Sequence, residues 1–302
     1  MKLRFIGYLA LATGCSGNIM GDDDGADAGG GEATIAFTSP APGATVTRDQ
    51  HSDLGALIAP LPLAAETTGP IARVVFERDG VGPVAEVNAA PWTATLEVEQ
   101  AGAVGLVAVG YDGNGAELAR AEVAVTVVDP EVADCHGWLD MYGLTYELGP
   151  ANDGVADPVT VTTPINGMIH RYVENTTPRA TFFMDCSLAL SLAKAAPILR
   201  KRGVVEMTDY GVYNYRCIGG VGTPPDCPNG ISQHAYAKAI DITGLNTPDT
   251  TYTIVDDWVI DPDTEETCAA ATESDKDQWL HETICELKAA GTWNIVLTPN
   301  YN

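Results

Sequence analysis

The stretch Ser232-Gln233-His234-Ala235-Tyr236-Ala237-Lys238-Ala239-Ile240-Asp241 is the part of this 302-residue chain that says most about its fold. It places a histidine and an aspartate seven residues apart, with a serine two residues before the histidine. Imidazole and carboxylate groups are zinc ligands, and a catalytic zinc keeps three protein ligands and a water. A turn over 235–238 followed by a strand over 239–242 would bring His234 and Asp241 together. The alternative is an unconnected turn histidine and strand-end aspartate, because two ligands do not make a site.

The N-terminus has the pattern of a bacterial export signal. Lys2 and Arg4 precede a short apolar run over 5–11, which is too short to span a bilayer. The sequence Leu11-Ala12-Thr13-Gly14-Cys15 resembles a lipobox, in which residues 1–14 form the signal peptide and Cys15 becomes the lipidated first residue. The alternative is an ordinary secretory signal with a chance cysteine. We therefore expect a location in the bacterial cell envelope, with the membrane contacted through the lipid anchor only.

Residues 15–32 are rich in glycine and aspartate and have few apolar side chains to bury. This composition predicts a flexible tether, and the aspartate cluster at 22–24 lacks the closing glutamate of a calcium loop. The whole chain has 16 Lys+Arg against 41 Asp+Glu, for a net charge of −25. Such a charge disfavours nucleic acid as a partner, because neutralising phosphates requires clustered cations.

The cysteine count indicates disulfides. Apart from Cys15, six cysteines remain, all from residue 135 onward, and an even number in an exported chain favours disulfide bonds. Six cysteines allow 15 pairings. The most local pair is Cys217 with Cys227, and one plausible full set adds Cys135–Cys186 and Cys268–Cys285. A zinc–cysteine cluster is disfavoured because the sequence has no CxxC pair.

Residues 33–128 predict an all-β domain. Runs rich in valine, threonine and aromatics alternate with turn signals, and they predict strands over 34–37, 72–78, 93–98, 104–111 and 117–128. Evenly spaced short strands are typical of a β-sandwich. The segment from Pro91 to Asp112 resembles bacterial immunoglobulin-like domains, which commonly act as spacers or adhesive modules. The sole histidine of this region, His51, is expected to be solvent-exposed.

From residue 133 onward the pattern is mixed α and β. Leucine spacing predicts a helix over 185–202, which Pro197 should kink or divide and Gly203 should end. A second helix is predicted over 274–290, with Ser274 as its N-cap and Gly291 at its C-terminal end. Strands are predicted over 204–207 and 295–297. The predicted fold class is therefore multidomain, with the sandwich followed by an α+β domain over 133–302.

Three motifs in this domain carry a family resemblance. Ser232-x-His234-x-x-Ala237-x-Ala239-x-Asp241 resembles the SxHxxGxAxD signature of D-alanyl-D-alanine carboxypeptidases and related peptidoglycan peptidases, which share the hedgehog-type zinc fold. The flanking segments, Tyr210-Gly211-Val212-Tyr213-Asn214-Tyr215-Arg216-Cys217 and Val296-Leu297-Thr298-Pro299-Asn300-Tyr301-Asn302, resemble the extensin-like C-terminal domain family. That family is a branch of the same superfamily, and the resemblance covers about residues 133–302.

The resemblance implies a role for four residues. His234 and Asp241 match the first two zinc ligands, and Ser232 matches a residue that supports the ligands by hydrogen bonding. Arg216 stands where these enzymes place a cation near the substrate, and its planar fork would suit a peptide carboxylate. A surface or structural salt bridge is the equal alternative for Arg216. Zinc is thus the implied cofactor, and peptidoglycan or another cell-wall polymer is the implied partner.

The sequence also departs from the family pattern. The signature glycine is Ala237 here, a mild change unless the backbone needs a positive φ. The family continues beyond its Pro-Asn-Tyr-Asn segment into a strand with the third ligand histidine, whereas this sequence stops at Asn302. We therefore expect the domain to lack its last strand, and no catalytic residue can be assigned. His281-Glu282-Thr283-Ile284-Cys285 resembles HExxH, but Cys285 is a disulfide candidate.

Other histidine and serine arrangements are weaker. His136 and His170 match no ligand position and are expected to be surface or structural. A serine triad of Ser232, His234 and Asp241 is disfavoured because no nucleophile elbow surrounds the serine.

Two functions remain. The first is a cell-surface lipoprotein whose zinc carboxypeptidase-like domain acts on or binds peptidoglycan stem peptides. The second is a degenerate or truncated, non-catalytic wall-binding module on an immunoglobulin-like spacer. The sequence alone leaves open whether the chain is an enzyme.

Overall fold

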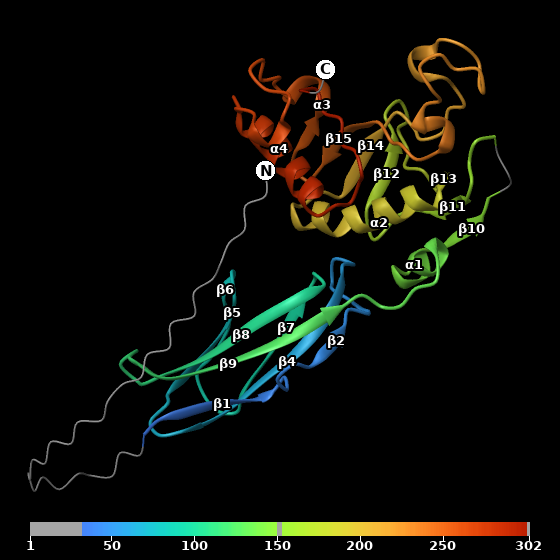
Figure 1. Ribbon diagram of the computed structural model, residues 1–302. Coiled ribbons are helices and arrows are strands. Elements are labelled where there is room, and N and C mark those ends of the chain that lie inside the picture. The colour runs from blue at the N-terminus through green and yellow to red at the C-terminus, as the bar shows by residue number, and fades with distance from the viewer. Residues whose placement is uncertain (1–31, 150–152, 301–302) are drawn as a thin grey trace, which may run out of the picture.

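The computed structural model describes residues 32–149 and 153–300 (Figure 1). The predicted signal peptide, the lipidation cysteine Cys15 and all but the last residue of the predicted tether lie outside the described residues. Within the described ranges, no helix has the length and apolar character needed to cross a membrane.

The N-terminal part is a β-sandwich, as the sequence predicts. One sheet has the order β1-β4-β3 with β7 also paired to β4, and the other has the order β2-β9-β8-β5-β6. Inward side chains from both sheets, among them Leu61, Phe76 and Leu106, form one buried core. The strands are β1 (Thr34–Ser39), β2 (Thr45–Thr47), β3 (Gln50–His51), β4 (Leu57–Thr68), β5 (Arg73–Arg78), β6 (Gly82–Val87), β7 (Trp92–Val98), β8 (Gly102–Tyr111) and β9 (Glu117–Val128).

The longest strand that sequence patterns missed is β4, which contains two prolines. Ala59, Leu61 and Leu63 point into the core, while Pro60 and Pro62 alternate with them. Over 59–63 the strand pairs with β7 only, because β1 pairs with 64–68 and β3 with 57–58. One edge of this segment therefore needs no ladder hydrogen bonds, which is where proline is tolerated in a sheet.

The C-terminal part combines two small sheets with helices (Figure 1). One sheet has the order β10-β11-β13, and the other has the order β12-β14-β15-β16, in which only β12 and β14 are parallel. A core separate from that of the sandwich includes Met184, Leu192 and Leu280. The strands are β10 (Tyr146–Leu148), β11 (Pro158–Thr162), β12 (Ile169–Tyr172), β13 (Thr181–Asp185), β14 (Glu206–Asp209), β15 (Ile242–Asn246) and β16 (Thr251–Thr253), and the helices are α1 (Cys135–Met141), α2 (Cys186–Lys201), α3 (Ile254–Asp257) and α4 (Asp275–Ala289), with short 3-10 turns η1 (Ile218–Gly220), η2 (Gln233–Tyr236) and η3 (Thr267–Ala269).

Helix α2 continues through Pro197 as a single helix. The sequence had predicted that Pro197 would kink or divide it, and the division does not occur. A proline inside a helix removes the hydrogen bond to the carbonyl four residues earlier. That carbonyl belongs to Ala193, and the side-chain amide of Asn166 donates to it at 3.0 Å. A neighbouring loop thus replaces the donor that Pro197 lacks, and the helix continues to Lys201.

Three disulfides join the six cysteines: Cys135–Cys186, Cys217–Cys227 and Cys268–Cys285. The sequence left fifteen pairings open, and the structure forms the one set that was singled out as plausible. Three disulfides are typical of a protein exported to an oxidising compartment.

Two predicted strands are displaced or wrong. Residues 295–297 form no strand, and Ile295 and Leu297 are 73% and 67% exposed. A strand requires a hydrogen-bonded neighbour, and no described segment pairs with this one. The strand expected over 239–242 begins only at Ile242, as β15.

Candidate functional site

The structure brings His234 and Asp241 into direct contact. His234 Nε2 lies 3.2 Å from Asp241 Oδ1. His234 belongs to the 3-10 turn η2, and Asp241 stands immediately before β15. The imidazole is largely covered, with 14% of its side chain exposed, whereas the carboxylate is 58% exposed. A turn followed by a strand therefore achieves the contact, although the strand starts later than the spacing predicts.

The turn that carries His234 is capped at both ends. Ser232 Oγ accepts a hydrogen bond from the backbone N–H of His234 at 3.3 Å, so this serine supports the backbone of His234 and not its ring. At the other end Ala237 has φ 52° and ψ 32°, in the left-handed region. Its position is the signature glycine of the resembling family. The backbone does need a positive φ here, so alanine at this site is a strained choice.

The orientation of the imidazole is set by a main-chain carbonyl. His234 Nδ1 lies 2.8 Å from Val212 O, which accepts a hydrogen bond from a protonated Nδ1. Nε2 then faces Asp241. The hydrogen bond to Asp241 raises the pKa of His234 above its ordinary value, although burial opposes the shift. The same hydrogen bond lowers the pKa of Asp241.

The pair has the geometry of two neighbouring zinc ligands. Two ligands bound at roughly 2.05 Å with a tetrahedral angle between them are about 3.3 Å apart, close to the observed separation. Ligand histidines commonly donate their other ring N–H to a carbonyl, as His234 does to Val212. No third His, Cys, Asp or Glu in the described ranges joins these two atoms within 4.8 Å. Within residues 32–149 and 153–300, His234 and Asp241 thus form a pair without a third candidate metal ligand.

Arg216, the predicted substrate residue, is exposed near this pair. Its charge lowers the pKa of both His234 and Asp241 as a secondary cause. Among the described residues no carboxylate forms a salt bridge with Arg216, and its carbonyl accepts from the backbone N–H of Ser232 at 3.1 Å. Its backbone is therefore fixed beside the turn while its guanidinium remains available.

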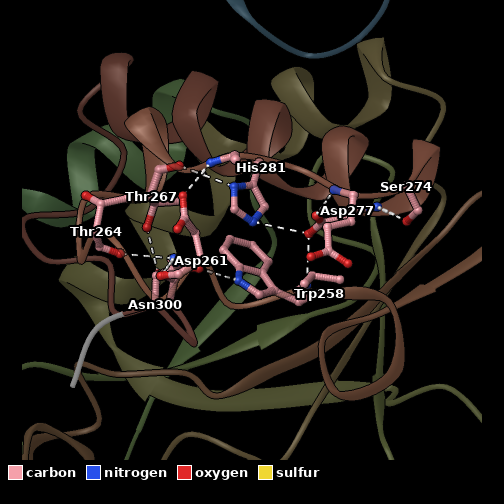
Figure 2. A network of polar contacts seen from close by, with 12 residues as sticks. Trp258, Asp261, Thr264, Thr267, Ser274, Asp277, His281 and Asn300 are labelled. Atoms are coloured by element: carbon pink, nitrogen blue, oxygen red, sulfur yellow. Dashed lines mark hydrogen bonds and ion pairs between the residues drawn. The ribbon is translucent and has the colours of Figure 1, made fainter.

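The HExxH-like segment is part of a structural network (Figure 2). Cys285 is joined to Cys268, which removes it as a ligand. His281 is buried, its ring centroid lies 4.0 Å from that of Trp258, and its Nε2 lies 3.2 Å from Asp277 Oδ1. Trp258 Nε1 in turn donates to Asn300 Oδ1 at 2.8 Å. These contacts fix the segment before residue 301 against helix α4. The arrangement gives no support to a metal site formed by the HExxH-like residues of this helix.

The remaining histidines are distributed as structural or surface residues. His51 is exposed on β3. His170 is 1% exposed on β12, and neither of its ring nitrogens has a hydrogen-bond partner among the described residues. His136 Nε2 lies 3.0 Å from Asp157 Oδ1, beside the Cys135–Cys186 disulfide. The cysteines are bonded to each other, so this group does not define a metal site.

A scan against protein-family models found no match, and a search of curated proteins found none either. Among solved structures, the fibronectin(III)-like modules of Clostridium thermocellum CbhA are 18% identical, with a TM-score of 0.26 over 33% of this chain and 99% of that one. The sulfur carrier protein SoxY from Chlorobium limicola f thiosulfatophilum is 17% identical, with a TM-score of 0.23 over 31% and 78%. Bacteroides uniformis beta-glucuronidase 3 is 13% identical, with a TM-score of 0.25 over 43% and 15%. The assignment of a β-sandwich rests on the strand order and the shared core of this chain.

Proposed function

We propose that residues 133–302 form a zinc-peptidase-like domain, related to the extensin-like and D-alanyl-D-alanine carboxypeptidase families, that acts on or binds peptidoglycan stem peptides. The observation that carries the proposal is the 3.2 Å contact of His234 Nε2 with Asp241 Oδ1. The protein would be a lipoprotein of the bacterial cell envelope, anchored through Cys15, with the sandwich as a spacer. The three disulfides support an exported protein, and the anchor rests on the lipobox-like sequence.

Each residue of the site has a defined task in this proposal. His234 and Asp241 would hold the metal, and Val212 O fixes the orientation of the imidazole through Nδ1. Arg216 would bind a peptide carboxylate, because a guanidinium matches a carboxylate with two parallel hydrogen bonds. Zinc, when bound in such sites, lowers the pKa of a water and polarises the scissile carbonyl.

The second candidate function is a non-catalytic wall-binding module. It is favoured by the exposed guanidinium of Arg216 together with Tyr215, which is 38% exposed, and Tyr210, which is 56% exposed. An exposed cation and exposed aromatic side chains are groups that can bind a peptide terminus without any metal chemistry.

The test uses the purified full chain with zinc and with peptidoglycan sacculi. Zinc binding is measured by calorimetry, cleavage by mass spectrometry of released peptides, and binding by co-sedimentation. We expect saturable zinc binding that His234→Ala and Asp241→Ala abolish, whereas His51→Ala, an exposed histidine of the sandwich, leaves it unchanged. Zinc-dependent release of peptides supports the peptidase.

Co-sedimentation without cleavage supports the binding module, provided that Arg216→Ala weakens it and Arg120→Ala, an exposed arginine of the sandwich, does not. A chain that neither binds zinc nor sediments with sacculi would refute both functions.

A further inference from the structure

A short segment between β14 and the Cys217–Cys227 disulfide forms hydrogen bonds with both candidate ligand residues, His234 and Asp241. We call residues 210–214 the strap. Tyr210 N–H donates to Asp241 O at 2.9 Å, and Asn214 N–H donates to His234 O at 3.0 Å. Between them, Val212 O accepts from His234 Nδ1 at 2.8 Å. The strap therefore fixes the backbone of both ligand residues and the ring of one, by three hydrogen bonds.

The base of the strap is fixed by a buried carboxylate. Asp209, the last residue of β14, is 0% exposed, and its Oδ1 accepts from Gly211 N–H at 2.7 Å. Gly211 has φ 105°, a value that side-chain-bearing residues rarely adopt, so the chain turns sharply at this point. Asp209 thus sets the direction in which the strap leaves the sheet.

Arg179 compensates the charge of this carboxylate. Its Nη2 donates to Asp209 Oδ1 at 2.7 Å, while Asp209 Oδ2 has no hydrogen-bond partner among the described residues. The guanidinium lies 4.4 Å from the ring centroid of Phe182 and 5.4 Å from that of Tyr172, which fixes its plane. Removing one partner of a buried ion pair leaves an uncompensated charge, which is strongly unfavourable. The position of Asp209 therefore depends on Arg179.

We propose that Asp209 and Arg179 are positioning residues that act through the strap to hold the His234 ring with Nδ1 against Val212 O and Nε2 directed at Asp241. The proposal rests on the proposed function of the His234–Asp241 pair as metal ligands. Neither Asp209 nor Arg179 contacts the proposed metal ligands directly. Asp209 contacts Gly211 in the strap, and the strap contacts His234 and Asp241. Supporting residues of this kind typically change metal affinity by about 10- to 100-fold when they are replaced.

The experiment compares Asp209→Asn and Arg179→Gln with the parent chain. Asparagine keeps the acceptor for Gly211 but loses the charge, and glutamine loses the guanidinium. Nitrogen-15 NMR of the histidine rings reports the hydrogen bond of His234 Nδ1 to Val212 O, and competition with a chromophoric chelator reports the zinc dissociation constant. We expect a weakened Nδ1 hydrogen bond and a roughly 10-fold or greater loss of zinc affinity.

Asp277→Asn is the matched control. Asp277 is also 0% exposed and paired with a cation-forming side chain, His281, but it contacts the backbone at Val259 and Glu273 and not the strap. An unchanged hydrogen bond of His234 Nδ1 to Val212 O in folded Asp209→Asn or Arg179→Gln would overturn the proposal. An equal change in Asp277→Asn would overturn it too, because the effect would then be general destabilisation.

Two further outcomes are separable. If the parent chain binds no zinc, the proposed function fails, and the NMR measurement of the Nδ1 hydrogen bond still decides the role of Asp209 and Arg179. If Asp209→Asn does not fold, Arg179→Gln and Arg179→Lys carry the test. Lysine keeps the charge, so it should restore part of the parent Nδ1 hydrogen bond, and its failure to do so would count against the proposal.

Discussion

Ala237 provides a direct test of the backbone geometry beside His234. It is 0% exposed and has φ 52°. A left-handed conformation costs a residue with a side chain about 1–2 kcal/mol, and glycine avoids this cost. Ala237→Gly also has two destabilising effects. It removes a buried methyl group, which costs about 0.8 kcal/mol, and it raises the entropy of the unfolded chain, which costs about 0.4–1 kcal/mol. The terms nearly cancel, so we expect this substitution to change the free energy of unfolding by less than about 1 kcal/mol.

Ala235 is the matched control, because it lies in the same turn, is also 0% exposed and has no positive φ. Ala235→Gly has the same two destabilising effects, but it relieves no left-handed strain. It should therefore destabilise the protein by about 1.5 kcal/mol. The two variants should therefore differ by about 1–2 kcal/mol.

Urea unfolding followed by tryptophan fluorescence measures this difference. Four of the five tryptophans, Trp138, Trp258, Trp279 and Trp293, lie in the C-terminal part, so the signal mostly reports the unfolding of that part. If Ala237→Gly destabilises the protein as much as Ala235→Gly, no left-handed strain is relieved, and the reasoning about the signature position is wrong.

Three further predictions concern residues away from the turn. Burial lowers the pKa of His170 to about 4, whereas in the unfolded chain His170 binds a proton near pH 6.5. The free energy of unfolding should therefore fall by about 3 kcal/mol as the pH drops from above 6.5 to about 4. Unfolding curves of His170→Leu should lack this pH-dependent loss. Asn166→Ala should cost about 1–3 kcal/mol in urea unfolding, because the Ala193 carbonyl above Pro197 loses its donor; an unaffected variant would contradict that account. Replacing both Cys217 and Cys227 by serine should cost about 2.5 kcal/mol from loop entropy, and a stability equal to that of the parent would show that the ten-residue separation constrains little.

The sandwich was predictable because its strands obey local patterns. In β8 and β9 the valines and threonines mark strands directly, whereas β4 was missed because Pro60 and Pro62 read as turn residues. What permits them is the one-sided pairing of β4, and this is a property of the assembled sheet. Helices α2 and α4 were predictable from their leucine spacing and ends. The donor from Asn166 that lets α2 continue lies about 30 residues away from Pro197 and leaves no local signal.

The site shows the same division between local and long-range information. The seven-residue spacing left open whether His234 and Asp241 meet, and it carries no information on the partners that orient them. Val212 contributes a carbonyl, which any residue has, and Asp209 stands between Thr208 and Tyr210 without a recognisable motif around it. The strand expected over 295–297 was wrong because its pattern is apolar and β-branched but no described strand pairs with it. The roles of Arg216, Ser232 and Cys15 stay predictions.

The loop at Asn166 also has a consequence for how far the candidate site can reach. Arg200, one turn after Pro197, donates from Nη1 both to Asn166 O at 3.2 Å and to Leu54 O in the sandwich at 3.0 Å. The two parts of the chain are thus joined at a second point besides the covalent connection near residue 130, which opposes rotation about that connection. The distance and direction from the sandwich to His234 are therefore set by the fold and not by a flexible connection.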